Sequence, residues 1–96
     1  MSYEKWMKDM IWWLKRQPLV LENYHMAHAI FDGRATTINV QARFHSMKEP
    51  LVYDGTAIDN GTGITVRSKH WKSATSAAQH ALTELGAKLK EKGILK

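Results

Sequence analysis

The apolar positions at the start of the chain recur with the period of an α-helix. Over residues 3–17 they form a single stripe, made of Trp6, Met7, Met10, Trp13 and Leu14. Such a stripe is the side of a helix that packs against a core. Pro18 is expected to end the helix, because the residue before a proline is disfavoured in the α region. Trp12 falls among lysines, where its ring either widens the core stripe or faces a ligand; we expect it to stay exposed.

The middle of the chain alternates between apolar and polar residues, as a half-buried strand does. Over residues 37–45 one side carries Ile38, Val40, Ala42 and Phe44, and the other carries Thr37, Asn39, Gln41 and Arg43. This pattern predicts a sheet with one buried and one wet face. Further strands are predicted over residues 24–31 and 51–58, with turns at 32–34 and 59–63 and a bulge or bend at Gly55. Residues 64–66 form either a short fourth strand or a lead into the next helix.

A second helix is predicted from about Lys69, with Ser68 as its N-cap. Its apolar stripe consists of Trp71, Ala74, Ala78, Ala81, Leu82, Leu85 and Leu89. Gly86 is expected to end the packed portion, with the residues beyond it forming a solvated tail. The fold class is therefore α+β, an α-β-β-β-α chain whose three- to four-stranded antiparallel sheet carries both helices on one face. The predicted core is Trp6, Met10, Trp13, Tyr24, Ile38, Val40, Trp71, Ala78, Leu82 and Leu85.

Length and composition bound the remaining possibilities. The 96 residues predict one domain, with a core over about 3–89 and a basic C-terminal tail over 90–96. The net charge of +5 suits an acidic partner. The chain has no cysteine, which excludes disulfides and zinc–thiolate sites and fits a reducing compartment. No run of about 18 apolar residues and no signal-peptide pattern occurs, so a cytoplasmic protein without a membrane partner is expected.

The approach to the second helix is purely basic. Arg67, Lys69, His70 and Lys72 occur there, and no Asp or Glu lies between Asp59 and Glu84. Cations near a helix N-terminus, together with its exposed N–H groups, favour phosphate. This segment is the best candidate for contacts with a nucleic acid.

In its order of elements the chain resembles the double-stranded-RNA-binding domain, an α-β-β-β-α family. Residues 19–24 are similar to the segment that leads into the family's first strand and ends in a buried tyrosine, here Tyr24. Gly33 stands where the family has a glycine between its first two strands, and residues 77–82 fit its alanine-rich second helix. The family's phosphate-binding lysine motif is incomplete, since its positions hold His70, Trp71 and Ala74.

The resemblance implies binding of double-stranded RNA by shape and phosphate contacts, without sequence specificity. The expected contact residues are Lys5, Lys8, Trp12, Arg34, Arg67, Lys69, His70 and Lys72. In this arrangement the first helix and Arg34 reach successive minor grooves, while the basic cluster spans the phosphates between them. The small size suits a viral or phage suppressor that masks duplex RNA. The alternative is a protein-interaction module or inhibitor of the same fold that has lost RNA binding.

Enzymatic function is not expected. No serine or lysine stands beside a convincing base and orienting group, so no catalytic residues are assigned. His25 and His28 have odd spacing, which places them on opposite faces of a flat strand and makes a poor chelate. We therefore expect no metal site and no cofactor. The oligomeric state is left open.

Overall fold

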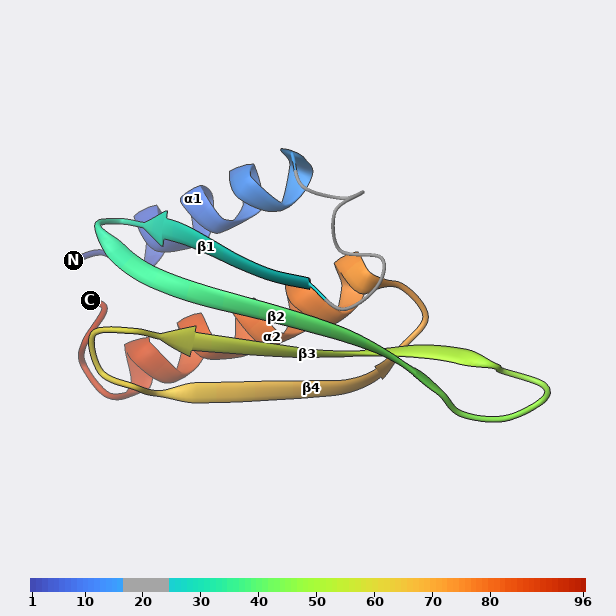
Figure 1. The fold of residues 1–96 in the computed structure, drawn as a ribbon. Coiled ribbons are helices and arrows are strands. Elements are labelled where there is room, and N and C mark those ends of the chain that lie inside the picture. The colour runs from blue at the N-terminus through green and yellow to red at the C-terminus, as the bar shows by residue number, and fades with distance from the viewer. Residues whose placement is uncertain (17–24) are drawn as a thin grey trace.

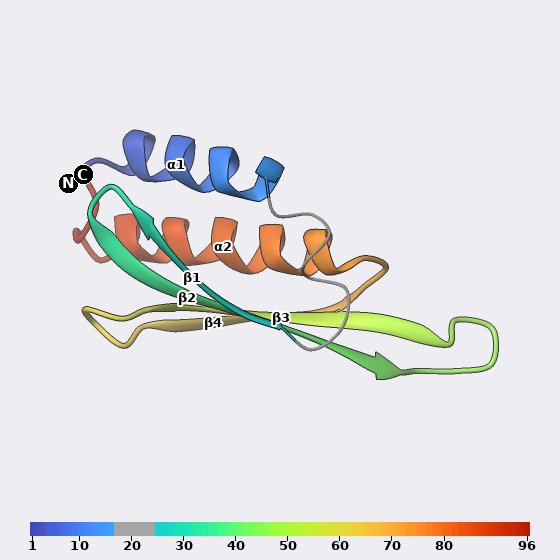
Figure 2. The same ribbon diagram turned by 45° about the horizontal axis from the view of Figure 1, so that its top comes forward.

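The protein folds as two layers, a four-stranded sheet and a pair of helices. A computed structural model describes residues 1–16 and 25–96. The elements are α1 (Tyr3–Arg16), β1 (His25–Phe31), β2 (Arg34–Phe44), β3 (Leu51–Asp59), β4 (Thr65–Trp71) and α2 (Ala74–Glu91). The strands are antiparallel in the order β1-β2-β3-β4, and both helices lie on one face (Figures 1 and 2). The predicted α+β architecture is confirmed, with four strands. Gln17 and Tyr24, predicted to belong to the first helix and first strand, lie outside the described residues.

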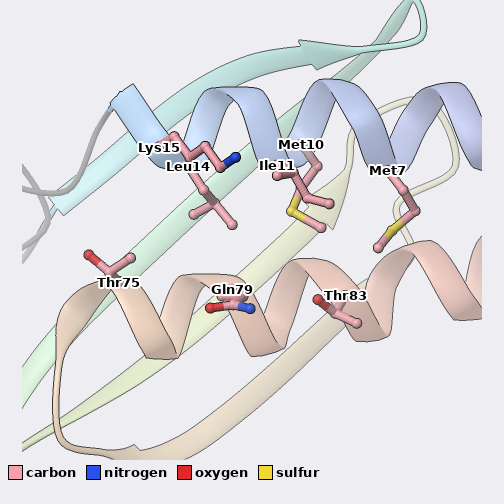
Figure 3. Close-up of a pocket in the computed structure, with 8 residues that line it drawn as sticks. All are labelled: Met7, Met10, Ile11, Leu14, Lys15, Thr75, Gln79 and Thr83. Atoms are coloured by element: carbon pink, nitrogen blue, oxygen red, sulfur yellow. The ribbon is translucent and has the colours of Figure 1, made fainter.

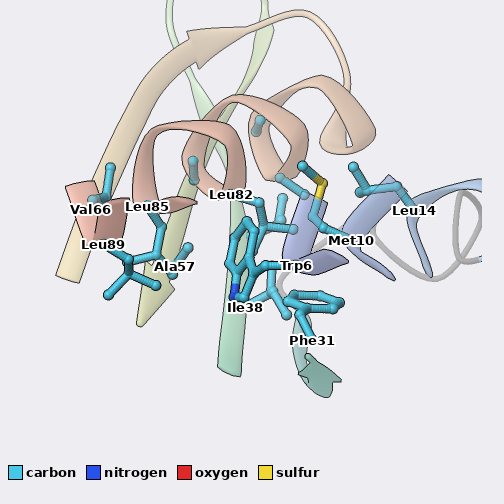
Figure 4. Packing of buried hydrophobic residues seen from close by; sticks show 14 of the residues in the cluster. Trp6, Met10, Leu14, Phe31, Ile38, Ala57, Val66, Leu82, Leu85 and Leu89 are labelled. Carbon is cyan, nitrogen blue, oxygen red and sulfur yellow. The ribbon is translucent and has the colours of Figure 1, made fainter. Parts of the chain in front are cut away.

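Each helix covers a different part of the sheet. α2 packs on β2, β3 and β4, whereas α1 packs against α2 and β1. Trp6 of α1 is fully buried between the layers, with Phe31 of β1 edge-on to it at a centroid distance of 5.3 Å (Figure 4). The predicted core residues that are buried are Trp6, Met10, Ile38, Val40, Ala78, Leu82 and Leu85. Trp13 and Trp71 are only partly buried at the margin of this core, contrary to expectation.

Two glycines allow the layers to approach closely. A Cβ on Gly55 of β3 would lie 2.4 Å from the carbonyl oxygen of Ala77 in α2. A Cβ on Gly86 of α2 would lie 2.7 Å from the indole ring of Trp6. The expectation that Gly86 ends the packed part of the helix is therefore wrong, because this glycine is buried and seats α1 against α2.

The core also extends beyond residue 89. After α2 the chain turns at Gly93, and Leu95 returns to the core with only 1% of its surface exposed. The Tyr3 N–H donates to the Lys96 carbonyl at 3.1 Å, and the Lys96 N–H donates to the Met1 carbonyl at 3.0 Å. The last residues are thus packed and hydrogen-bonded, although Lys90 and Lys92 are exposed as expected.

The largest correction concerns the boundary between β4 and α2. The helix begins at Ala74 and is capped by Ser73, whose hydroxyl accepts from the Ser76 N–H. Ser68, predicted to be the cap, lies in β4, and its hydroxyl donates to the Ala77 carbonyl at 3.2 Å. Because residues 65–71 pair with β3, Lys69 belongs to a strand and not to the helix start.

Candidate functional site

The first group of predicted contact residues lies on the solvent side of α1. Lys5, Lys8 and Trp12 are exposed, and Trp12 shows 59% of its surface, as expected. Lys5 pairs with Asp9 at 3.1 Å, and the Arg16 guanidinium lies 3.9 Å from the centre of the Trp12 ring. The Asp9 carboxylate also accepts from the Asp32 N–H, and these two bonds hold its pKa below the usual value. Lys8, the other predicted lysine of this group, forms no ion pair with a described residue.

Arg34 is a structural residue. It is the first residue of β2, and its guanidinium makes two bonds to the Asp59 carboxylate, at 2.9 Å and 2.7 Å. Asp59 is fully buried and also accepts from the Thr62 hydroxyl and N–H. Burial raises the pKa of Asp59, but the bonds from Arg34 and Thr62 outweigh it and leave that pKa lowered. The prediction that Arg34 projects from the β1–β2 turn is wrong, because this pair holds it against the β3–β4 turn.

Arg67 and Lys69 lie on the sheet face turned away from the helices, called the open face below. The alternation of β4 explains this, because Val66 and Ser68 are buried towards α2 and their neighbours must point the other way. Arg67 and Lys69 line a shallow hollow of about 570 Å³, whose other walls are mostly polar: Asn39, Gln41, Asp54, Gly55, Thr56, Ile58 and Thr65. Neither cation takes part in an ion pair with another described residue.

Lys72 and His70 lie where β4 meets α2. Lys72 is exposed in the turn before the Ser73 cap, in a helix whose first turn has no acidic residue. His70 has a positive φ of 70° in an irregular part of β4, and its ring nitrogen Nε2 lies 2.9 Å from a Glu49 carboxylate oxygen. His70 is thus engaged with the β2–β3 loop.

The eight predicted residues do not form the single surface that was expected. The α1 group lies on the helix side of the sheet, whereas Arg67 and Lys69 lie on its open face. Only Arg67, Lys69 and Lys72 come from one short segment as exposed cations without an ion-pair partner in the described part of the chain. The expected arrangement failed because it assumed that Lys69 begins a helix, whereas Lys69 lies in β4.

The open face contains a charged network beside the hollow. Asp54 accepts from the Arg43 guanidinium at 2.7 Å and from the His70 N–H at 3.0 Å. Burial raises the pKa of Asp54, but these bonds and the charge of Lys69 hold it below the usual value. The network therefore keeps the Asp54 carboxylate next to Lys69. Arg67, two residues earlier in β4, lies on the same face of the sheet.

A second hollow separates the two helices. It measures about 400 Å³. Its lining consists of four apolar side chains and one lysine from α1 and three polar side chains from α2: Met7, Met10, Ile11, Leu14, Lys15, Thr75, Gln79 and Thr83 (Figure 3). In the close-up the α1 side chains point down towards the α2 residues. This volume is within the range of small-molecule pockets, but the groove carries no cluster of titratable groups.

The β2–β3 hairpin carries exposed apolar residues, one of which the alternation pattern placed incorrectly. Phe44 was expected on the buried face, yet it is 66% exposed, and Met47 in the loop is 90% exposed. The hairpin extends past the N-terminal start of α2, so no helix covers its tip (Figures 1 and 2). To predict the exposure of Phe44, one would need to know that the hairpin extends beyond the helices. No local sequence pattern reports that length.

Comparison with known proteins adds no assignment, since no protein-family model, curated protein or solved structure matches this chain. Among the described residues, neither helix has the length and apolar character needed to cross a membrane.

Proposed function

We propose that this protein binds double-stranded RNA through its sugar–phosphate backbone, without reading base sequence. The observation that carries the proposal is the polar hollow on the open face, which Arg67 and Lys69 line beside hydroxyl and amide side chains. Cations favour phosphate, and hydroxyls and amides are the groups that hydrogen-bond sugars and phosphates. The net charge of +5 favours the same partner.

The shape of the open face suits a duplex. Four strands about 4.8 Å apart present a surface about 14 Å across, and A-form RNA offers a wide, shallow minor groove bounded by phosphates. Lys72 extends the cationic segment past the end of β4. We place this activity in the cytoplasm, where a viral or phage suppressor would mask duplex RNA.

The test measures the salt dependence of binding. Wild type, Arg67→Ala/Lys69→Ala and a charge-matched control, Lys88→Ala/Lys92→Ala on the exposed end of α2, are titrated with a duplex RNA of mixed sequence at several salt concentrations. Each lost phosphate contact reduces the slope of log K against log salt by up to about 0.9, so the first variant should have a slope shallower by about 1–2. The control should retain the wild-type slope.

Additional ligands and variants define the surface. Duplex DNA and single-stranded RNA report whether A-form shape matters, and Lys5→Ala/Lys8→Ala tests the contribution of α1. A wild type that does not bind duplex RNA refutes the proposal. An Arg67→Ala/Lys69→Ala variant with the wild-type slope refutes the open face as the contact surface.

Protein binding is the second candidate, because exposed Phe44 and Met47 lie on the projecting hairpin. Exposed apolar groups of this size mark interaction sites when they cluster. The discriminating variant is Phe44→Ser/Met47→Ser. If this variant no longer binds a purified protein partner of the wild type but still binds duplex RNA as the wild type does, the protein-interaction module is favoured over RNA binding.

A further inference from the structure

Three metal-ligating side chains converge where the β2–β3 loop meets the end of β4. They are His45, directly after β2, Glu49, in the loop, and His70, near the end of β4. Their potential ligand atoms all lie within 4.8 Å of one another. No metal site was predicted from the sequence, because His45 and His70 are far apart along the chain and are brought together only by the pairing of β4 with β3.

The loop fixes His45 and Glu49 relative to each other. The His45 N–H donates to the Pro50 carbonyl at 3.2 Å, and the Ser46 N–H donates to the Glu49 carbonyl at 3.1 Å. The Glu49 N–H in turn donates to the Ser46 hydroxyl at 3.1 Å. Two of the three side chains are therefore held on a closed, hydrogen-bonded loop.

His70 is directed to the same place by an unusual backbone. Its φ of 70° is in the left-handed region, which a non-glycine residue seldom adopts. The pairing of β3 and β4 shifts register here, since two residues of β4 lie opposite Asp54 alone. The Asp54 carboxylate accepts the His70 N–H at 3.0 Å and holds this conformation. Bulges and left-handed residues of this kind redirect side chains and cluster at functional sites.

The three groups crowd together without satisfying one another. Glu49 Oε1 has almost no contact with solvent and no hydrogen-bond donor. His70 Nε2 lies 2.9 Å from it, but the contact lacks hydrogen-bond geometry. The His45 and His70 rings meet edge to face at a centroid distance of 4.3 Å and an angle of 88°. A shielded carboxylate oxygen close to two imidazoles is an arrangement that a cation can complete.

We infer that His45, Glu49 and His70 bind a divalent first-row transition metal of the zinc class. Two imidazoles and a carboxylate form a known zinc donor set, and nitrogen donors disfavour Mg²⁺ and Ca²⁺. With metal–ligand bonds of about 2.0–2.2 Å, two ligands of a tetrahedral ion lie about 3.3 Å apart. The observed spacing brackets this value, so small side-chain rotations complete the site. The fourth position is open to water or to a partner's ligand.

This inference is independent of RNA binding. The ion would join the β2–β3 loop to β4 and so fix the direction of this loop, which carries Met47. Because both histidines are partly exposed, the ion would reach the site from solvent without unfolding of the core.

The test is a calorimetric titration of tag-free protein with Zn²⁺, and with Mg²⁺ for comparison. Wild type should bind one Zn²⁺ per chain saturably and should not bind Mg²⁺. His45→Ala, Glu49→Gln and His70→Asn should each weaken Zn²⁺ binding at least as much as the loss of an outer-shell partner does, about 10–100-fold. Asparagine is chosen at residue 70 because it tolerates a positive φ.

His28→Ala is the matched control, since His28 is an exposed histidine of β1 outside the cluster. It should bind Zn²⁺ as wild type does. Circular dichroism of the metal-free variants checks that the fold is retained, and Glu49→Gln, the most conservative change, keeps the test decisive if a histidine variant unfolds. Absence of saturable one-to-one binding by wild type overturns the inference. So does wild-type affinity in Glu49→Gln and His45→Ala.

Discussion

Replacement of Gly55 by alanine should destabilise the protein strongly, because β3 and α2 touch through their backbones at this residue. The added Cβ would lie 2.4 Å from the oxygen and 2.7 Å from the carbon of the Ala77 carbonyl. Ordinary contact begins near 3.4 Å, so the layers must separate by about 1 Å, and overpacking of this kind costs about 1–3 kcal/mol. Separation also weakens the Ser68–Ala77 hydrogen bond, worth about 0.5–1.5 kcal/mol. We expect a total loss of about 2–4 kcal/mol.

The assay is urea unfolding followed by tryptophan fluorescence. The midpoint should fall with little change in the m-value, which would show lower stability and not an altered denatured state. Gly63→Ala is the control, since Gly63 has a φ of 77° but no atom near its missing Cβ; it should cost only about 1 kcal/mol.

A second substitution identifies the source of the clash. Ala77→Gly in the Gly55→Ala background removes the Ala77 side chain, yet the backbone carbonyl stays in place, so no rescue is expected. A Gly55→Ala protein within about 0.5 kcal/mol of wild type, the range of harmless surface changes, would refute the reasoning. Rescue by Ala77→Gly would show that the side chain was the obstacle.

Two further predictions concern the pair Arg34–Asp59 and the indole of Trp71. Asp59→Asn should destabilise the protein at pH 7 by about 3–5 kcal/mol, because it leaves the largely buried Arg34 guanidinium without its anion. The folded-state pKa of Asp59 is lowered, so the stability that its ionised carboxylate contributes to wild type is present above the unfolded pKa of about 3.9 and is lost as the pH falls below it. Urea unfolding at pH 7 and pH 2.5 should therefore show a smaller stability difference between wild type and Asp59→Asn at the lower pH. An equal difference at the two pH values would contradict this. Trp71→Ala should cost about 1–3 kcal/mol, below the about 3–5 kcal/mol of a fully buried tryptophan, because Trp71 is half-buried and stacked at 3.6 Å on His80. Exposed Trp12→Ala is its control, and an equal effect of the two changes would show that Trp71 does not contribute to the core.

The parts of the fold that depend on local periodicity could be predicted. The stripe containing Trp6 and Met10 predicted α1 with its buried side correct. Alternation predicted β2 and the burial of Ile38 and Val40, but Thr37 is buried and Phe44 is exposed, contrary to the pattern. The turn at Asp32 and Gly33 was also predicted. In the structure both residues have the positive φ that a tight hairpin needs. In these segments the local pattern and the tertiary environment favour the same structure.

The β4–α2 boundary could not be predicted, because long-range pairing decides it. Trp71 has helical spacing to Ala74 and Ala78, and this spacing extended the predicted helix backwards. In the structure Trp71 pairs with Tyr53 of β3, so β4 continues to residue 71. Lys69 therefore lies inside the strand, before the helix begins. Ser73, which caps the helix in the structure, lay inside the helix predicted from Lys69 and so was not predicted to be a cap. This one boundary moved Lys69 to the open face, and it also concealed that His70 meets His45.

The seating of Trp6 against Gly86 has a consequence for synthesis on the ribosome. The contact joins the first helix of the chain to the last. At about 5–20 residues per second, roughly 4–16 s separate translation of these two residues. During that interval the apolar side of α1 has no permanent cover, whereas each strand from β2 onwards meets the preceding one as soon as it emerges. The nascent chain therefore leaves its largest core side chain without its native cover until α2 has emerged from the ribosome.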